Sequence, residues 1–103
     1  MTISCEIDVA ERYGKLAGRE AGARARAYIL VTLKTCPVVS INLRGTKLTP
    51  SFADECLGRL LDELGVEEFR QRIKVVEVPP LAAPLLHHVL SRRASQRPRS
   101  AAG

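Results

Sequence analysis

Aromatic residues are scarce in this chain of 103 residues: it has two Tyr, two Phe and no Trp. A core must therefore be built mainly from Leu, Val, Ile and Ala, and the 46% of hydrophobic residues is enough for one. The same scarcity leaves the folded part few rings on which nucleic-acid bases would stack. The length predicts a single globular domain.

Cysteine is also sparse, and its pattern excludes two kinds of site. The three cysteines, Cys5, Cys36 and Cys56, are far apart, and no C-x-x-C pair is present. This argues against a zinc knuckle and against a thioredoxin-like redox motif. Each lies in an apolar setting, so we predict three small buried residues, as expected in a reducing compartment.

Long apolar runs are missing. No stretch approaches the roughly 18–20 apolar residues that span a membrane. The first residues, MTISCEIDVAERYGK, lack the basic start and apolar run of a secretory signal. We predict a cytoplasmic protein that is not bound to a membrane.

The motifs of common enzymes are absent as well. The sequence has no G-x-x-x-x-G-K-[ST] phosphate loop, no G-x-G-x-x-G and no H-E-x-x-H. His87 and His88 are adjacent, so on a helix they point about 100° apart and cannot bind one metal ion together. Neither is marked as the partner of a nucleophilic Ser or Cys. We therefore expect no catalysis, no cofactor and no metal site.

Positive charge gathers at the end of the chain. Four arginines, Arg92, Arg93, Arg97 and Arg99, lie in the last dozen residues, where there is no acid. Without them 12 basic residues face 11 acidic ones, so the rest of the chain is nearly neutral although the net charge is +5. Such a tail is either simply solvated or binds nucleic acid or an acidic surface.

Hydrophobic periodicity predicts alternating strands and helices. Alternation predicts a strand at 3–9, and a turn with a short second strand around 13–16 follows. Steps of three and four residues predict helices over 22–35, from about 50 to 64, and from 84 onward, with a helical turn at 66–72. Apolar β-branched runs predict strands at 38–43, buried on both faces, and at 73–78. We predict an α/β domain over residues 1–93: a small mixed, partly parallel four-stranded sheet with helices packed on one side. A disordered basic tail then covers 94–103.

The start of the central helix admits two interpretations. Thr49 is the N-cap with Pro50 at the first helical position, or Ser51 is the cap and Asp54 closes a capping box. Gly65 is expected just past the end of this helix.

The segment VVSINLRGTKLTPSFADE, residues 38–55, resembles the STAS-like domain family of unknown function. In that family an apolar strand ends in an acidic or amide residue, and a loop, Ser-Phe, an acidic pair and a Leu- and Gly-rich helix follow. The stretches CLGRL at 56–60 and LGVEEF at 64–69 continue the similarity, and Gly18-Arg19 and Gly22-Ala23-Arg24 match it upstream. The resemblance covers roughly residues 3–93 and implies a STAS-like fold.

That family is in turn similar to the STAS domains of anti-sigma factor antagonists. Those domains bind a regulator of the histidine-kinase type of ATPase, and phosphorylation of a Ser at a helix N-terminus breaks the complex. The equivalent residue here is Ser51, or Thr49 in another alignment. The antagonists have Asp-Ser-Ser-Gly where this chain has Thr-Pro-Ser-Phe, and Ser51 is otherwise read as a helix cap.

We therefore predict a non-catalytic regulatory module that binds a protein partner, as in partner switching. Its predicted surface is the loop 44–50 with the exposed start of the next helix, comprising Arg44, Lys47, Thr49, Ser51, Asp54 and Glu55, with Ser51 the expected phosphorylation site. The alternative is a nucleic-acid-associated protein that binds through Arg92, Arg93, Arg97 and Arg99.

Overall fold

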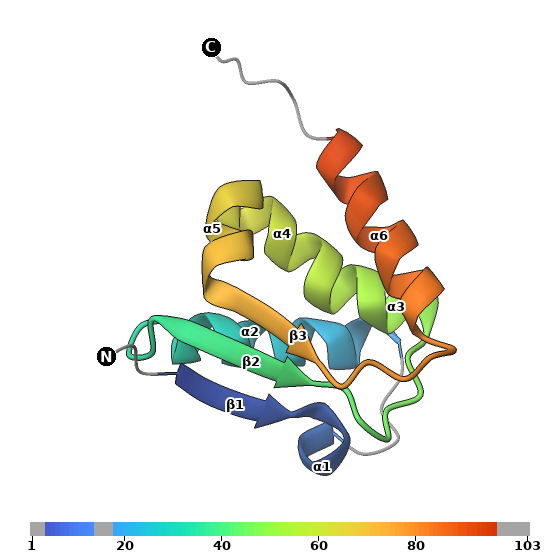
Figure 1. Ribbon diagram of the computed structural model, residues 1–103, viewed down its shortest axis with the longest axis horizontal. Coiled ribbons are helices and arrows are strands. Elements are labelled where there is room, and N and C mark those ends of the chain that lie inside the picture. Colours follow the sequence, from blue (N-terminus) through green and yellow to red (C-terminus); the bar gives the residue numbers. More distant parts are fainter. Residues whose placement is uncertain (1–3, 14–17, 97–103) are drawn as a thin grey trace.

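Three parallel strands form a single sheet (Figure 1). The computed structural model describes residues 4–13 and 18–96. The strands are β1 (Ser4–Asp8), β2 (Val38–Asn42) and β3 (Ile73–Val76), in the order β1-β2-β3. Their register places Ile7 beside Ile41, and Ile41 beside Val75.

The prediction of a mixed four-stranded sheet is wrong: the described residues contain three strands, all parallel. After β1 the chain turns at once into a short helix, α1 (Val9–Tyr13). Tyr13, where the additional strand was expected to begin, is thus helical, and the rest of that expected strand lies outside the described residues.

The connections between the strands are helical, as the periodicity predicts. Between β1 and β2 lies α2 (Arg19–Thr32), and the expected face Gly22, Ala25, Ile29 and Leu33 is buried. Between β2 and β3 one continuous helix comprises α3 (Pro50–Ala53), a π-helical turn η1 (Asp54–Gly58) and α4 (Arg59–Leu64), and α5 (Val66–Arg72) follows it. The last helix is α6 (Ala83–Gln96).

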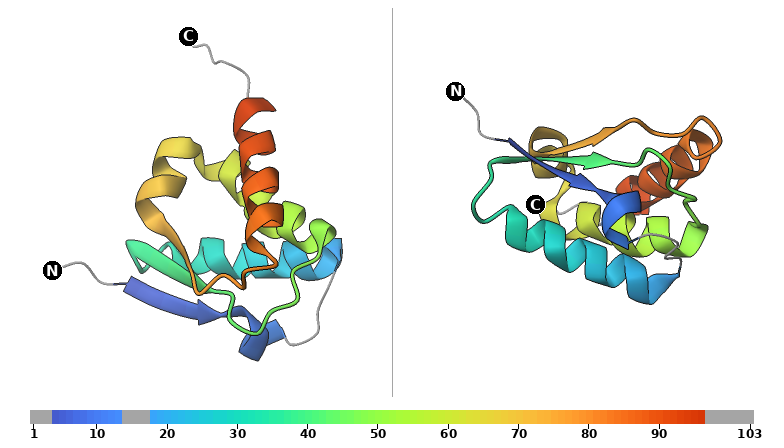
Figure 2. Two further views of the ribbon diagram at one scale, coloured as in Figure 1. Left: turned by 45° about the vertical axis from the view of Figure 1, so that its right-hand side comes forward. Right: turned by 90° about the horizontal axis from the view of Figure 1, so that it is seen from below.

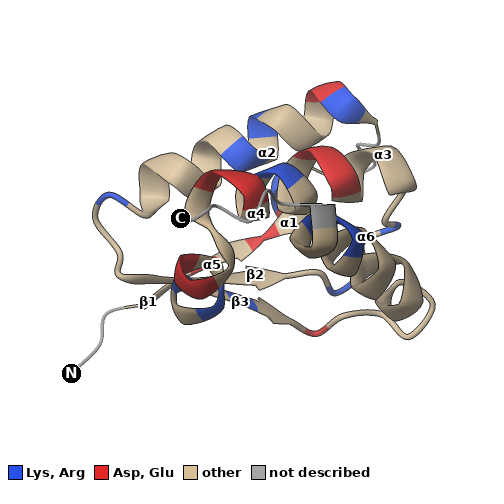
Figure 3. Ribbon diagram, turned by 90° about the horizontal axis from the view of Figure 1, so that it is seen from above, with Lys and Arg blue, Asp and Glu red and all other residues tan. Residues whose placement is uncertain are grey.

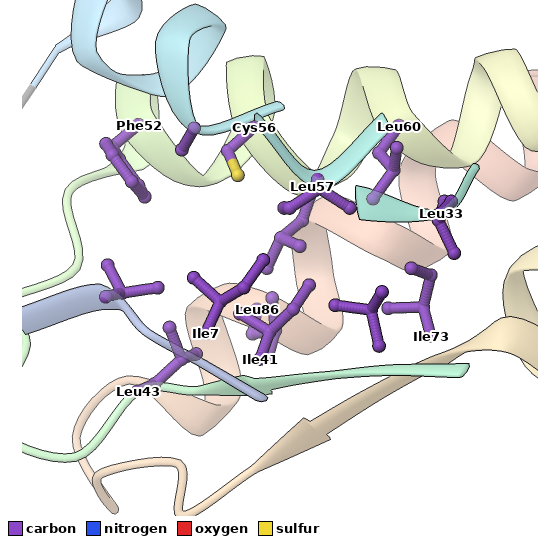
Figure 4. Close-up of a cluster of buried hydrophobic side chains, with 14 of the residues drawn as sticks. Ile7, Leu33, Ile41, Leu43, Phe52, Cys56, Leu57, Leu60, Ile73 and Leu86 are labelled. Atoms are coloured by element: carbon purple, nitrogen blue, oxygen red, sulfur yellow. The ribbon is translucent and has the colours of Figure 1, made fainter. Parts of the chain in front are cut away.

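The main helices lie on one side of the sheet, and this side contains the core (Figure 2). Ile41 of β2 is fully buried there, beneath Leu57 and Leu60 of the continuous helix from α3 to α4, which we call the central helix (Figure 4). Val39 is fully buried in the same cluster. The opposite face carries the half-buried Ser40, so β2 is not buried on both faces as expected. Helices cover one face only, which explains why polar residues alternate with apolar ones in β1.

Two glycines let the helices approach closely. A Cβ on Gly22 of α2 would lie 2.8 Å from the Cβ of Glu55 and 3.0 Å from the carbonyl oxygen of Phe52. A Cβ on Gly58 would lie 2.9 Å from the Asp54 carboxylate and 3.3 Å from the Cγ of Arg93. A side chain at position 22 would push α2 away from the central helix, whereas one at position 58 would displace the side chains of Asp54, Val89 and Arg93. Both helices therefore bring their arginines against the acidic residues that follow α3.

Two of the three cysteines are paired, which differs from the prediction. Cys5 at β1 and Cys36 before β2 form a disulfide, although we expected three free thiols. The pairing depends on β1 and β2 lying side by side, with Cα atoms 6.1 Å apart, which spacing in the sequence cannot reveal. Cys56 is free and buried, as predicted.

Helix α6 continues to Gln96, so Ala94 to Gln96 are helical rather than part of an unstructured tail. Arg92 and Arg93 therefore belong to this helix, while Arg97 and Arg99 lie outside the described residues. Across residues 4–13 and 18–96, no helix has the length and apolarity that crossing a membrane requires.

Candidate functional site

The loop that follows β2 begins at a buried amide. Asn42 is 3% exposed; its side-chain Nδ2 donates to the carboxylates of Glu6, at 2.8 Å, and Glu77, at 2.9 Å. Its Oδ1 accepts a hydrogen bond from the Arg44 backbone N–H at 2.8 Å. This amide, at the carboxyl end of β2, thus links β1 to the residue that follows β3. The hydrogen bond to the Arg44 N–H fixes the start of the loop, in which Arg44 and Lys47 are exposed.

Thr49 is the N-cap of α3, which decides between the two predicted starts. Its hydroxyl accepts from the Phe52 backbone N–H at 3.2 Å, and Pro50 occupies the first helical position. The same oxygen accepts from the Gly18 N–H at 3.5 Å, just before α2 begins. One hydroxyl thus joins the starts of two helices and places Arg19 near Ser51.

Ser51 is therefore not the helix cap. It is half-buried, and within residues 4–13 and 18–96 its hydroxyl has no hydrogen-bond partner. Asp54 does not close a capping box; its carboxylate binds arginines instead. The Ser51 hydroxyl is thus available for another role.

Ser51 opens into a pocket of about 460 Å³ between the starts of α2 and α3 and one side of α6. Its lining combines polar and charged side chains with a few apolar ones: Arg19, Pro50, Ser51, Asp54, Leu85, His88, Val89, Arg92 and Arg93. The pocket therefore unites residues of the predicted partner surface with two arginines of the predicted tail.

The acidic pair beside the pocket is held by arginines from both neighbouring helices. Figure 3 shows acidic residues along the helix from α3 to α4 and basic residues on the neighbouring α2 and α6. Asp54 accepts from Arg93 Nε at 2.9 Å and Nη2 at 2.7 Å, and from Arg19 at 3.3 Å. Arg93 also binds Asp62.

Glu55 contradicts the prediction of an exposed side chain, since it is 7% exposed. Its carboxylate pairs with Arg19, Arg26 and Arg59 at 3.1–3.2 Å, and Arg26 also donates to the Glu55 carbonyl oxygen. Gly22 permits this burial because it lets α2 lie directly against Glu55. The carboxylate has three cations around it, which compensates for its removal from water.

These contacts determine the protonation of the two carboxyl groups. The hydrogen bonds from Arg93, followed by those from Arg19, lower the pKa of Asp54 despite partial burial. Burial by itself would raise the pKa of Glu55, but the hydrogen bonds from Arg26, Arg19 and Arg59 together bring it below its ordinary value. Both groups are ionised at neutral pH, and neither is a proton donor for general acid catalysis.

The sequence did not assign the basic side chains of the pocket to this surface. Arg19 and His88 were noted separately, and Arg92 and Arg93 were assigned to the tail. Their convergence on Ser51 depends on the packing of α2 and α6 against the central helix. Among the described residues, no group of three or more His, Cys, Asp or Glu side chains is placed to hold a metal ion.

A family model described as a STAS-like domain of unknown function (DUF4325) matches residues 21–80. The chain belongs to this family. The match confirms the predicted resemblance over a shorter range than 3–93; it begins within α2 and ends in the loop after β3. No curated protein and no solved structure matches the chain significantly.

The matched range of this STAS-like domain includes Thr49, Ser51 and Glu55 but excludes Arg19 and the whole of α6. The pocket is therefore built partly from the family region and partly from segments outside it.

Proposed function

We propose that this STAS-like domain is a non-catalytic regulatory module that binds a protein partner through the loop 44–50 and the adjoining Ser51. The observation that carries the proposal is the position of Ser51. Its hydroxyl lies at a helix start without being used as the cap, because Thr49 has that role. A residue that can be modified without loss of the cap is suited to a reversible switch.

The loop supplies the rest of the surface. Arg44 and Lys47 are exposed on either side of the buried Thr46, and the loop is fixed at both ends, by Asn42 and by Thr49. A rigid loop loses little conformational entropy on binding, which favours its use for recognition. Asp54 and Glu55 hold the helices behind this surface in place; on present contacts their carboxylates face arginines of the same chain.

The resemblance to anti-sigma factor antagonists suggests the partner, a regulator of the histidine-kinase type of ATPase. Such a partner would transfer the γ-phosphoryl group of ATP to the Ser51 Oγ, releasing ADP and the hydroxyl proton. The modified side chain has almost two negative charges in place of a neutral hydroxyl. Repulsion of an acidic partner surface would then end the complex.

A site-specific photo-crosslinker tests the location of this surface. A benzophenone amino acid is placed at Lys47 and, as a control, at Lys34. Both lysines are exposed, but Lys47 follows β2 whereas Lys34 precedes it, so they lie at opposite ends of the sheet. We expect a covalent protein adduct in host cells from position 47 only. Equal adducts from both positions, or none from position 47, would refute the proposed surface.

We also propose a cytoplasmic location, on which the Cys5–Cys36 disulfide bears directly. Disulfides are rare in reducing compartments. Trapping of thiols by acid and alkylation in intact host cells measures the oxidised fraction. Free Cys5 and Cys36 would fit the cytoplasm, and a fully oxidised pair would indicate an oxidising compartment.

A further inference from the structure

The pocket beside Ser51 has more cationic hydrogen-bond donors than its own chain uses. Arg19 binds Asp54 and Glu55 through Nη1 alone, so its Nε and Nη2 have no hydrogen bond among the described residues. Arg92 is exposed and has no ion pair within the described part of the chain. His88 is exposed at the pocket wall, one turn before Arg92 on α6.

The carboxylate in the pocket wall already has arginine partners. Asp54 is the carboxylate among the lining residues, and it is shared by Arg93 and Arg19. Arg93 is committed to Asp54 and Asp62. Arg92 therefore faces the pocket without a carboxylate partner among the described residues, beside His88 and the unused Nε and Nη2 of Arg19.

We infer that this pocket binds a phosphate monoester. A phosphate dianion has three terminal oxygens, and an arginine can bind two of them at once with the paired N–H groups of its planar guanidinium. Arg19 and Arg92 come from two different helices, so they contact the group from two sides, and the Ser51 hydroxyl is a neutral donor on the third. The monoester is either a free phosphorylated molecule or a phosphate carried by Ser51 itself.

This inference extends the proposed function, because Ser51 belongs to both surfaces. A titration with phosphate needs no protein partner, however. Failure to bind phosphate leaves the partner surface untouched, and failure to find a partner leaves the pocket untouched.

The first test is a titration of the isotopically labelled full chain with inorganic phosphate and with O-phosphoserine, followed by NMR at constant ionic strength. We expect saturable shifts at the amides of Ser51 and His88. Arg92→Gln should weaken binding at least tenfold. Arg24→Gln is the matched control, since Arg24 is an exposed arginine of α2 outside the pocket, and it should leave the affinity unchanged. Shifts that chloride reproduces, or equal affinities for the two variants, would overturn the site.

The second test distinguishes the sources of the phosphate. Phosphoserine is incorporated at position 51, and its ³¹P signal is followed with pH in the wild-type background and in Arg92→Gln. The pocket is assigned to the group on Ser51 if two results are found. The pKa of the second ionisation of this phosphate is lower in the wild-type background than in Arg92→Gln, and the phosphorylated protein no longer binds free phosphate. An unaffected ³¹P titration with free phosphate still bound assigns it to a soluble monoester. If neither signal depends on Arg92, the inference is wrong.

Discussion

Arg93 of α6 and Asp54, the residue that follows α3, form a two-pronged ion pair. Nε of Arg93 lies 2.9 Å from Oδ1 of Asp54, and Nη2 lies 2.7 Å from Oδ2. Both side chains are about three-quarters buried, at 25% and 26% exposure. Because the two residues are 39 positions apart, the pair fastens the last helix to the wall of the pocket.

Arg93→Gln should lower the free energy of unfolding by about 1–2 kcal/mol, because it breaks a charge-assisted pair and leaves the largely buried Asp54 carboxylate with the longer contact to Arg19. Arg92→Gln is the matched control, one residue earlier and exposed, and should change stability by less than about 0.5 kcal/mol. Urea denaturation followed by circular dichroism measures both. Equal effects of the two substitutions would contradict the importance of the pair.

Acid should weaken the network of Asp54 and Glu55. In the folded state the pKa of each is below its ordinary value. Their contribution to stability is therefore complete above the pKa of the unfolded chain, near 4, and is lost as the pH falls through the folded values. The free energy of unfolding should decline below about pH 4. Asp54→Asn should flatten this decline, and a variant with the wild-type pH profile would show that the pair is not responsible.

Thr49 and Ser51 can be compared directly as helix caps. Thr49→Ala should destabilise the domain by about 1 kcal/mol, because it removes the acceptor for the Phe52 N–H. Ser51→Ala should have an effect of less than about 0.5 kcal/mol, since the Ser51 hydroxyl is not used. Thermal unfolding of the two variants measures the loss of stability in each. A larger loss from Ser51→Ala would restore Ser51 as the cap and weaken the case for a switch.

The Cys5–Cys36 disulfide closes a loop with a sequence separation of 31. The chain-entropy model predicts that such a link stabilises the fold by about 3–4 kcal/mol. The pair Cys5→Ser/Cys36→Ser should lose roughly that amount relative to the oxidised wild type. Addition of a reductant should then destabilise the wild type but not the double variant. Cys56 should remain unlabelled by alkylating reagents in the native protein, because burial raises the pKa of its thiol to about 12.

Sequence periodicity predicted much of the fold because local patterns report burial. The helical face that includes Ala25 and Ile29 is buried, and the alternation around Ile7 marks the core side of β1. The Thr49-Pro50 start was one of two predicted helix starts, since capping depends on neighbouring residues. Such features require only local information.

The features that periodicity missed depend on packing between distant segments. The disulfide requires β1 beside β2, and the burial of Glu55 requires Gly22 against the central helix. Arg92 and Arg93 resembled a loose basic tail in sequence, yet α6 places them at the pocket of Ser51. No local pattern reports that two distant arginine clusters converge.

The central claim is that the surface around Ser51 binds a protein under the control of that residue. The most direct measurement is affinity capture of the tagged full chain from its own host, with nuclease treatment, at low and high salt. Wild type is compared with Ser51→Glu and with Ser95→Glu, a control at an exposed serine of α6. The account predicts a stoichiometric protein partner with wild type and Ser95→Glu that is lost with Ser51→Glu. Equal recovery of the partner by all three proteins would contradict this account. So would recovery of nucleic acid alone, if a chain that ends at residue 96 no longer retains that nucleic acid.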